Sequence, residues 1–140
     1  MRVLFLSCLL LLCQPLFAAS NPKLPVTDIV LPDGFTVKAE TANTPRQQEL
    51  GLQFRTALGP NEGMLFTGEA ESWRLFWMLN TLIPLDMVFI HADKTVSVIH
   101  GNVPATDISG PAQNPARRGG MAQYVLELPA GAAAAHGLKK

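Results

Sequence analysis

Short apolar runs separated by turn residues dominate the second half of this chain. Each run holds only three to five residues, which is short for an amphipathic helix and typical of a strand. Strands of this length and spacing favour a β-rich α+β fold, a single compact antiparallel sheet rolled into a barrel-like or sandwich domain. The runs are Met64–Phe66, Leu75–Met78, Met87–Ile90, Thr95–Ile99 and Tyr124–Leu128.

A hairpin and a C-terminal helix are predicted from turn and capping chemistry. The β-prone segments Thr27–Leu31 and Phe35–Glu40 flank Pro32–Gly34, whose Pro-Asp-Gly sequence favours a tight turn. The alanine-rich segment Ala130–His136 ends before Gly137, which predicts a short helix with a glycine C-cap.

One further capped helix is expected near residues 45–54. Thr44 is a good N-cap, Pro45 suits the first helical position, and Gln47 completes a capping box. Gly51 lies inside this predicted helix and weakens it, and Gly59-Pro60 is expected to stop the element.

The polar, proline-containing segment from residue 101 to residue 120 predicts a long loop. The remaining apolar positions supply the predicted core, which comprises Leu52, Met64, Leu65, Phe66, Trp77, Leu85, Val88, Ile90, Val96, Val98, Val125 and Leu126.

Residues 1–20 are typical of a secretory signal peptide rather than of a folded element. Arg2 precedes the apolar run Val3–Leu12, and small residues follow at Ala18–Ser20. The run is too short to span a bilayer. Acylation at Cys13 or Cys8 is the alternative, but neither cysteine has the expected setting. We therefore expect a signal peptide over residues 1–20, one domain over residues 21–140, and a periplasmic or secreted location.

Removal of this segment takes both cysteines and Arg2 with it, leaving ten basic residues against eleven acidic ones. This balance argues against a nucleic-acid partner, which needs a basic surface. The three histidines show no metal-ligand spacing, and no nucleotide-binding fingerprint is present. We expect no metal, no cofactor and no transmembrane segment after signal cleavage.

Four motifs resemble an uncharacterised bacterial and archaeal family, domain of unknown function 192. The resemblance covers roughly residues 27–138 and implies a compact, β-rich single domain that is often exported, without implying any activity. The motifs are Arg46-x4-Gly51-Leu52-x2-Arg55, Glu62–Phe66, Phe76-Trp77-Met78-x-Asn80-Thr81-x2-Pro84-Leu85-Asp86, and Tyr124–Leu128.

The sequence departs from the family pattern at three positions. Leu79 replaces a usual lysine, and Lys94 replaces a usual glycine, so Lys94 is expected to adopt a left-handed backbone conformation. Relatives usually continue past the position of Lys140 into a glycine-aspartate pair and a final strand. Either the sequence is truncated there, or an open sheet edge remains for strand pairing or homodimer formation.

Asp86 and His100 form the strongest catalytic hypothesis. If His91 pairs with Thr95 across a hairpin loop, the same register places Asp86 opposite His100. Such a pair would raise the histidine pKa and suit acid–base chemistry. The structural alternative is that Asp86 accepts backbone hydrogen bonds from the loop at Asn80 and Thr81.

The other candidate site residues carry a binding hypothesis. Asn80 and Thr81 are placed to bind a ligand amide or carboxylate, or else they form a turn between two strands. Trp77 and Met78 are candidates to line a ligand pocket, but they point to opposite faces of one strand, so one face is core and only the other can bind. Arg46 would bind an anion, as would Arg55, although pairing of these arginines with Glu49, Glu62 or Glu127 is the structural alternative.

The sequence therefore predicts an exported small domain that binds a small ligand or a protein partner as an accessory module. The alternative is a small hydrolase or isomerase that uses Asp86 and His100, with Asn80 polarising a substrate group.

Overall fold

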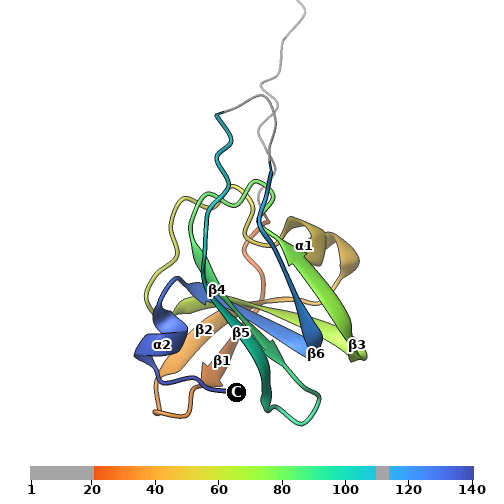
Figure 1. Cartoon of the computed structure of the whole chain (residues 1–140), viewed down its shortest axis with the longest axis vertical. Coiled ribbons are helices and arrows are strands. Elements are labelled where there is room, and N and C mark those ends of the chain that lie inside the picture. The colour runs from red at the N-terminus through yellow and green to blue at the C-terminus, as the bar shows by residue number, and fades with distance from the viewer. Residues whose placement is uncertain (1–20, 110–113) are drawn as a thin grey trace, which may run out of the picture.

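Six strands and two short helices make up the part of the chain that the computed structural model describes, residues 21–109 and 114–140 (Figure 1). The predicted signal peptide, residues 1–20, lies outside this part. In chain order the elements are β1 Val26–Val30, β2 Thr36–Ala42, α1 Pro45–Leu50, β3 Glu62–Trp77, β4 Leu85–Ile90, β5 Val96–Val103, β6 Arg117–Pro129 and α2 Ala132–Ala135.

The strands form one sheet in the order β1-β2-β3-β6-β4-β5. Every neighbouring pair is antiparallel except β2 and β3, which run parallel. The β-rich prediction is confirmed, but a wholly antiparallel sheet is wrong, because the connection through α1 carries the chain back before β3 begins. The described strands β1 and β5 end the sheet without pairing with each other, so the sheet is not closed into a barrel.

The predicted hairpin between β1 and β2 is confirmed. Gly34 adopts a φ of 87°, and its N–H donates to the carbonyl of Leu31 at 2.9 Å. The capping box that begins α1 is also confirmed: the Thr44 hydroxyl accepts from the N–H of Gln47, whose side chain accepts from the N–H of Thr44.

The end of α1 differs from the prediction. Gly51 is the C-cap of the helix, not an interior residue, and its φ of 46° ends the helix well before Gly59. At the other end of the chain, Gly137 adopts a φ of 64° just after α2, and the N–H of Leu138 donates to the carbonyl of Ala133 at 2.9 Å. The predicted C-terminal helix with its glycine cap is therefore confirmed.

Strand β3 joins two of the predicted apolar runs into one strand of 16 residues. A register shift between Thr67 and Ser72 divides it. The first half lies between β2 and β6, whereas Ser72–Trp77 pairs with β6 alone. The predicted long loop is shorter than expected, because β5 extends to Val103 and β6 begins at Arg117.

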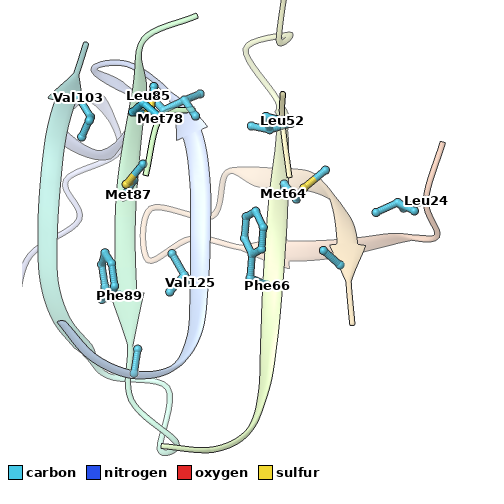
Figure 2. Close-up of a cluster of buried hydrophobic side chains, with 12 residues drawn as sticks. Leu24, Leu52, Met64, Phe66, Met78, Leu85, Met87, Phe89, Val103 and Val125 are labelled. Atoms are coloured by element: carbon cyan, nitrogen blue, oxygen red, sulfur yellow. The ribbon is translucent and has the colours of Figure 1, made fainter. Parts of the chain in front are cut away.

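Apolar side chains pack on both faces of the sheet, because successive side chains of each strand point to opposite faces. On β4, Met87 and Phe89 join one cluster, and Val88 joins the other. Figure 2 shows the first cluster, in which Val125 of β6 lies on the same face as Met87 and Phe89. Trp77 was expected in the core, but it is 48% exposed, since alternation along β3 turns it outward.

Asp86 connects three segments in the interior. The residue is 1% exposed, and its carboxylate accepts hydrogen bonds from the backbone N–H groups of Asn102 at 2.7 Å, Gly131 at 3.0 Å and Ala133 at 2.8 Å. The donors belong to the end of β5 and the start of α2, not to the loop at Asn80 that the sequence favoured. Asp86 therefore holds α2 against the sheet.

We expect Asp86→Ala to lower the free energy of unfolding by roughly 3 kcal/mol or more, because three backbone donors lose a charged acceptor. Urea denaturation measures the change. Asp107→Ala is the matched control, since that exposed aspartate also accepts a local backbone hydrogen bond, from Ser109. Equal losses in the two variants would contradict the role given to Asp86.

Candidate functional site

A cavity of about 310 Å³ lies between α1 and the second half of β3. Figure 1 shows α1 beside the end of β3, and the side chain of Arg74 on β3 donates to Gln48 Oε1 on α1 at 2.9 Å. Residues that reach the cavity come from α1 and the turn after it, from β3, and from β6. They are Gln48–Gln53, Phe66, Ser72–Trp77, Thr81 and Glu127.

One wall of the cavity is the edge of β3. Six consecutive residues, Ser72–Trp77, line it. Side chains of a strand point alternately to opposite faces, so consecutive residues reach one cavity along the backbone edge. That edge faces away from β6 and pairs with no other strand within residues 21–109 and 114–140.

Glu127 supplies a buried acid to the cavity. It lies near the C-terminal end of β6, with Met64 of β3 and Met87 of β4 as its cross-strand neighbours. The residue is 4% exposed, and its side chain forms no hydrogen bond or ion pair within the described part of the chain. Burial raises the pKa of the Glu127 carboxyl to about 8, so the group is largely protonated at neutral pH.

Arg74 places a positive charge beside the same cavity. Its guanidinium donates to the carbonyls of Gln123 at 3.1 Å and Phe66 at 3.4 Å, and it lies 5.3 Å from the ring centroid of Phe76. Burial lowers the pKa of Arg74, although an arginine keeps its charge at neutral pH. It forms no ion pair with a carboxylate among the described residues, so its charge is balanced only by dipoles.

Amide side chains complete the polar lining. The Gln48 amide donates to the carbonyl of Thr67 at 2.7 Å, and the Gln53 amide donates to the carbonyl of Glu49 at 2.7 Å. The Asn80 amide donates to Gln53 Oε1 at 3.0 Å. These bonds fix the orientation of the two glutamines, so the cavity has a defined polar wall.

The residues predicted to bind a ligand are divided among several places. Trp77 and Thr81 line the cavity, and Asn80 contacts it through Gln53. Met78 is fully buried in the core. Asn80 adopts a φ of 51°, and the N–H of Thr81 donates to the carbonyl of Met78 at 3.0 Å, which confirms the turn between two strands.

The two predicted anion-binding arginines are paired with acids outside the cavity. Arg46 lies 3.1 Å from Glu49 on the exposed face of α1, one of the expected pairings. Arg55 makes two hydrogen bonds to Glu40, at 2.8 and 2.9 Å, and not to the acids that the sequence suggested. Burial opposes ionisation of Glu40, but the hydrogen bonds from Arg55 and from the N–H of Leu24, together with the charges of Arg55 and Lys23, lower the pKa of Glu40.

The predicted register between Asp86 and His100 is wrong. The N–H of His91 does donate to the carbonyl of Thr95, at 2.9 Å. A shift between Phe89 and Ile90 then displaces the pairing by one residue, so that His100 lies opposite Met87. A one-residue slip reverses the face of every later side chain.

Asp86 and His100 consequently lie on opposite faces of the sheet. The ring of His100 contacts Phe89 edge-on at 5.6 Å between centroids, and its Nε2 lies 3.0 Å from the carbonyl of Gly119. Asp86 points to the other face, toward Ala133. The catalytic pair of the hydrolase or isomerase hypothesis is therefore not formed.

The main cavity residues, Glu127 and Arg74, were not among the predicted site residues. A signal for Glu127 does exist in the sequence. It follows Val125 at an interval of two, so strand alternation places it on the same buried face. No such signal marks Arg74, because its position depends on the register shift in β3.

The fold and the cavity define a small, β-rich domain with a polar cavity at a strand edge. The family model of domain of unknown function 192, described as an uncharacterised ACR, matches residues 29–140, so the chain belongs to this family. No curated protein sequence matches the chain.

Two solved structures are similar to this chain. A protein of unknown function from Novosphingobium aromaticivorans is 34% identical, with a TM-score of 0.72 and 86% of each chain covered. A protein from Sinorhizobium meliloti, provisionally described as a transcription regulator, is 35% identical, with a TM-score of 0.64, 80% of this chain covered and 84% of that one. No helix within residues 21–109 and 114–140 is long and apolar enough to cross a membrane.

The raised pKa of Glu127 predicts a pH-dependent stability. The folded pKa exceeds the ordinary value of 4.5, so the contribution of this group is complete below pH 4.5 and is lost as the pH rises to about 8. The full loss is about 5 kcal/mol from the difference in pKa. In urea denaturation, we expect the stability advantage of Glu127→Gln over the unsubstituted chain to grow from pH 5 to pH 9.

Glu69→Gln is the matched control, because Glu69 is an exposed acid on β3. Its stability difference from the unsubstituted chain should stay nearly constant over the same range. Parallel curves of unfolding free energy against pH for all three proteins would contradict the burial of an ionisable Glu127.

Proposed function

We propose that this chain is an exported binding module whose ligand site is the cavity between α1 and β3. The observation that carries the proposal is Glu127, a largely desolvated carboxyl group without a hydrogen-bond partner in the described part of the chain. No fully buried polar side-chain atom there lacks a partner, so the Glu127 oxygens are accessible from the cavity that the residue lines. Burying such a group without a partner costs stability, whereas methionine or leucine would fill the position with less cost. A ligand that accepts a hydrogen bond from Glu127 offsets this cost.

The chemistry of the lining defines the ligand class. Protonated Glu127 donates one hydrogen bond, and Arg74 provides a positive charge that no carboxylate in the described ranges neutralises. Both features favour a ligand with a carboxylate or a carbonyl oxygen. Affinity for such a ligand falls as the pH rises through about 8, because ionised Glu127 no longer donates and repels an anion.

Glu127→Met provides the test of the binding site. Methionine has a similar shape and suits the neighbouring Met64 and Met87, so we expect this variant to be at least as stable as the unsubstituted chain. Ligand-observed NMR with a library of small carboxylic acids and carboxamides should detect binding that this variant weakens about tenfold or more. Glu69→Gln should leave binding unchanged.

Two outcomes would contradict the proposal. One is that no member of the library binds the unsubstituted chain. The other is that Glu127→Met binds every ligand as tightly as the unsubstituted chain does. If Glu127→Met is more stable than the unsubstituted chain but binds the ligand less tightly, Glu127 serves a ligand site and not the packing of the core.

Export is the second half of the proposal, and the apolar run Val3–Leu12 with the small residues at Ala18–Ser20 supports it. Expression in a Gram-negative host should place the protein in the periplasm, and its intact mass should correspond to cleavage after Ala18, Ala19 or Ser20. Retention of residues 1–20, or a lipid mass on Cys13, would contradict this prediction.

A further inference from the structure

The edge of β3 beside the cavity offers unpaired backbone groups to a ligand. Ser72–Trp77 pairs with β6 on one side and with no described strand on the other. Every second residue of an edge strand turns its N–H and C=O outward, and these groups match the backbone of another extended chain. A peptide is the ligand class that can satisfy several of them at once.

Natural sheet edges are usually protected by lysine, by proline or by a covering segment. The sequence of Ser72–Trp77 contains neither lysine nor proline. Arg74 is its one charged residue, and the guanidinium turns inward to Gln48 and the carbonyl of Gln123. Lysine and proline are therefore absent from this edge, and α1 lies across the cavity from it.

The two faces of β3 next to this edge differ in chemistry. Trp73, Leu75 and Trp77 form an apolar outer face and are 68%, 65% and 48% exposed. Arg74 and Phe76 point to the inner face, where the cavity holds Glu127. An added strand would place alternate side chains beside these two surfaces.

We propose that an extended peptide segment pairs with the β3 edge over Ser72–Trp77, with apolar side chains over Trp73, Leu75 and Trp77 and acidic side chains directed into the cavity. Charge complementarity selects the acidic residues, because Arg74 forms no ion pair with a described carboxylate. Glu127 lines the same cavity. This inference rests on the proposed function, since it uses the same cavity and names its ligand class.

A positional-scanning library of hexapeptides, acetylated and amidated at their ends, provides the probe. Isothermal titration calorimetry should show that the tightest-binding peptides have acidic residues at alternate positions and apolar residues at the positions between them. The best peptide is then made in two N-methylated forms, one methylated at odd positions and one at even positions.

Strand pairing requires that the two N-methylated forms differ in affinity for the protein. In an added strand, only alternate N–H groups face β3, so one form should lose affinity about tenfold or more while the other keeps it. Equal affinity of the two forms overturns the proposal. The proposal is also overturned if no peptide of the library binds, or if the peptides that bind show no alternation of acidic and apolar residues.

Leu75→Lys tests the edge from the side of the protein, since an added lysine protects strand edges. It should abolish peptide binding. Val30→Lys is its matched control, because Val30 is an apolar residue of similar exposure, 68% against 65%, on the edge strand β1. A second copy of the chain is the rival occupant: a dimer in sedimentation that Leu75→Lys dissociates would overturn the peptide proposal.

The small-acid titration with Glu127→Met separates this inference from the proposed function. If small carboxylic acids bind and hexapeptides do not, the cavity is a ligand site but the edge is not a peptide site. If hexapeptides bind equally well to Glu127→Met, the edge pairs with peptide while Glu127 has no part in it.

Discussion

Double pairing of β6 is the constraint on which the rest of the structure depends. Tyr124–Glu127 of this strand pair with β3 on one side and with β4 on the other, so these residues have neighbours along both edges. Val125 is thereby enclosed in the core, and Glu127, two residues later, is enclosed on the same face. A carboxyl group in this position is desolvated by the sheet itself, which explains its raised pKa and its protonated state at neutral pH.

The parallel pairing of β2 and β3 determines where the sheet leaves an edge open. Because β2 ends at Ala42, it pairs with only the first half of β3. After the register shift, β3 continues as a strand whose outer edge faces α1 across the cavity. One irregularity in β3 thus places an unpaired backbone edge, the charge of Arg74 and the acid of Glu127 around the same space.

Much of the fold could be predicted because local chemistry decided it. The turn at Gly34, the capping box at Thr44 and the cap at Gly137 each depend on a few adjacent residues. The positive φ of Lys94, 74°, also followed from the family pattern, and its Nζ lies 3.3 Å from the ring centroid of Tyr124. The prediction of an Asp86–His100 pair is wrong because a one-residue shift in a hairpin has no local sequence signature. The shift reverses the face of the sheet to which His100 points.

The sequence by itself determined the β-rich class, the hairpin, the helix caps and the family, since these depend on short-range patterns. Tertiary structure alone decided the parallel pair, the open edge of β3 and the placement of Arg74 and Glu127 around one cavity, although they are 53 positions apart in the chain. The physical reason is that burial and desolvation depend on which strands become neighbours. A glutamate in an apolar strand is an ordinary sequence feature until pairing on both sides removes its water.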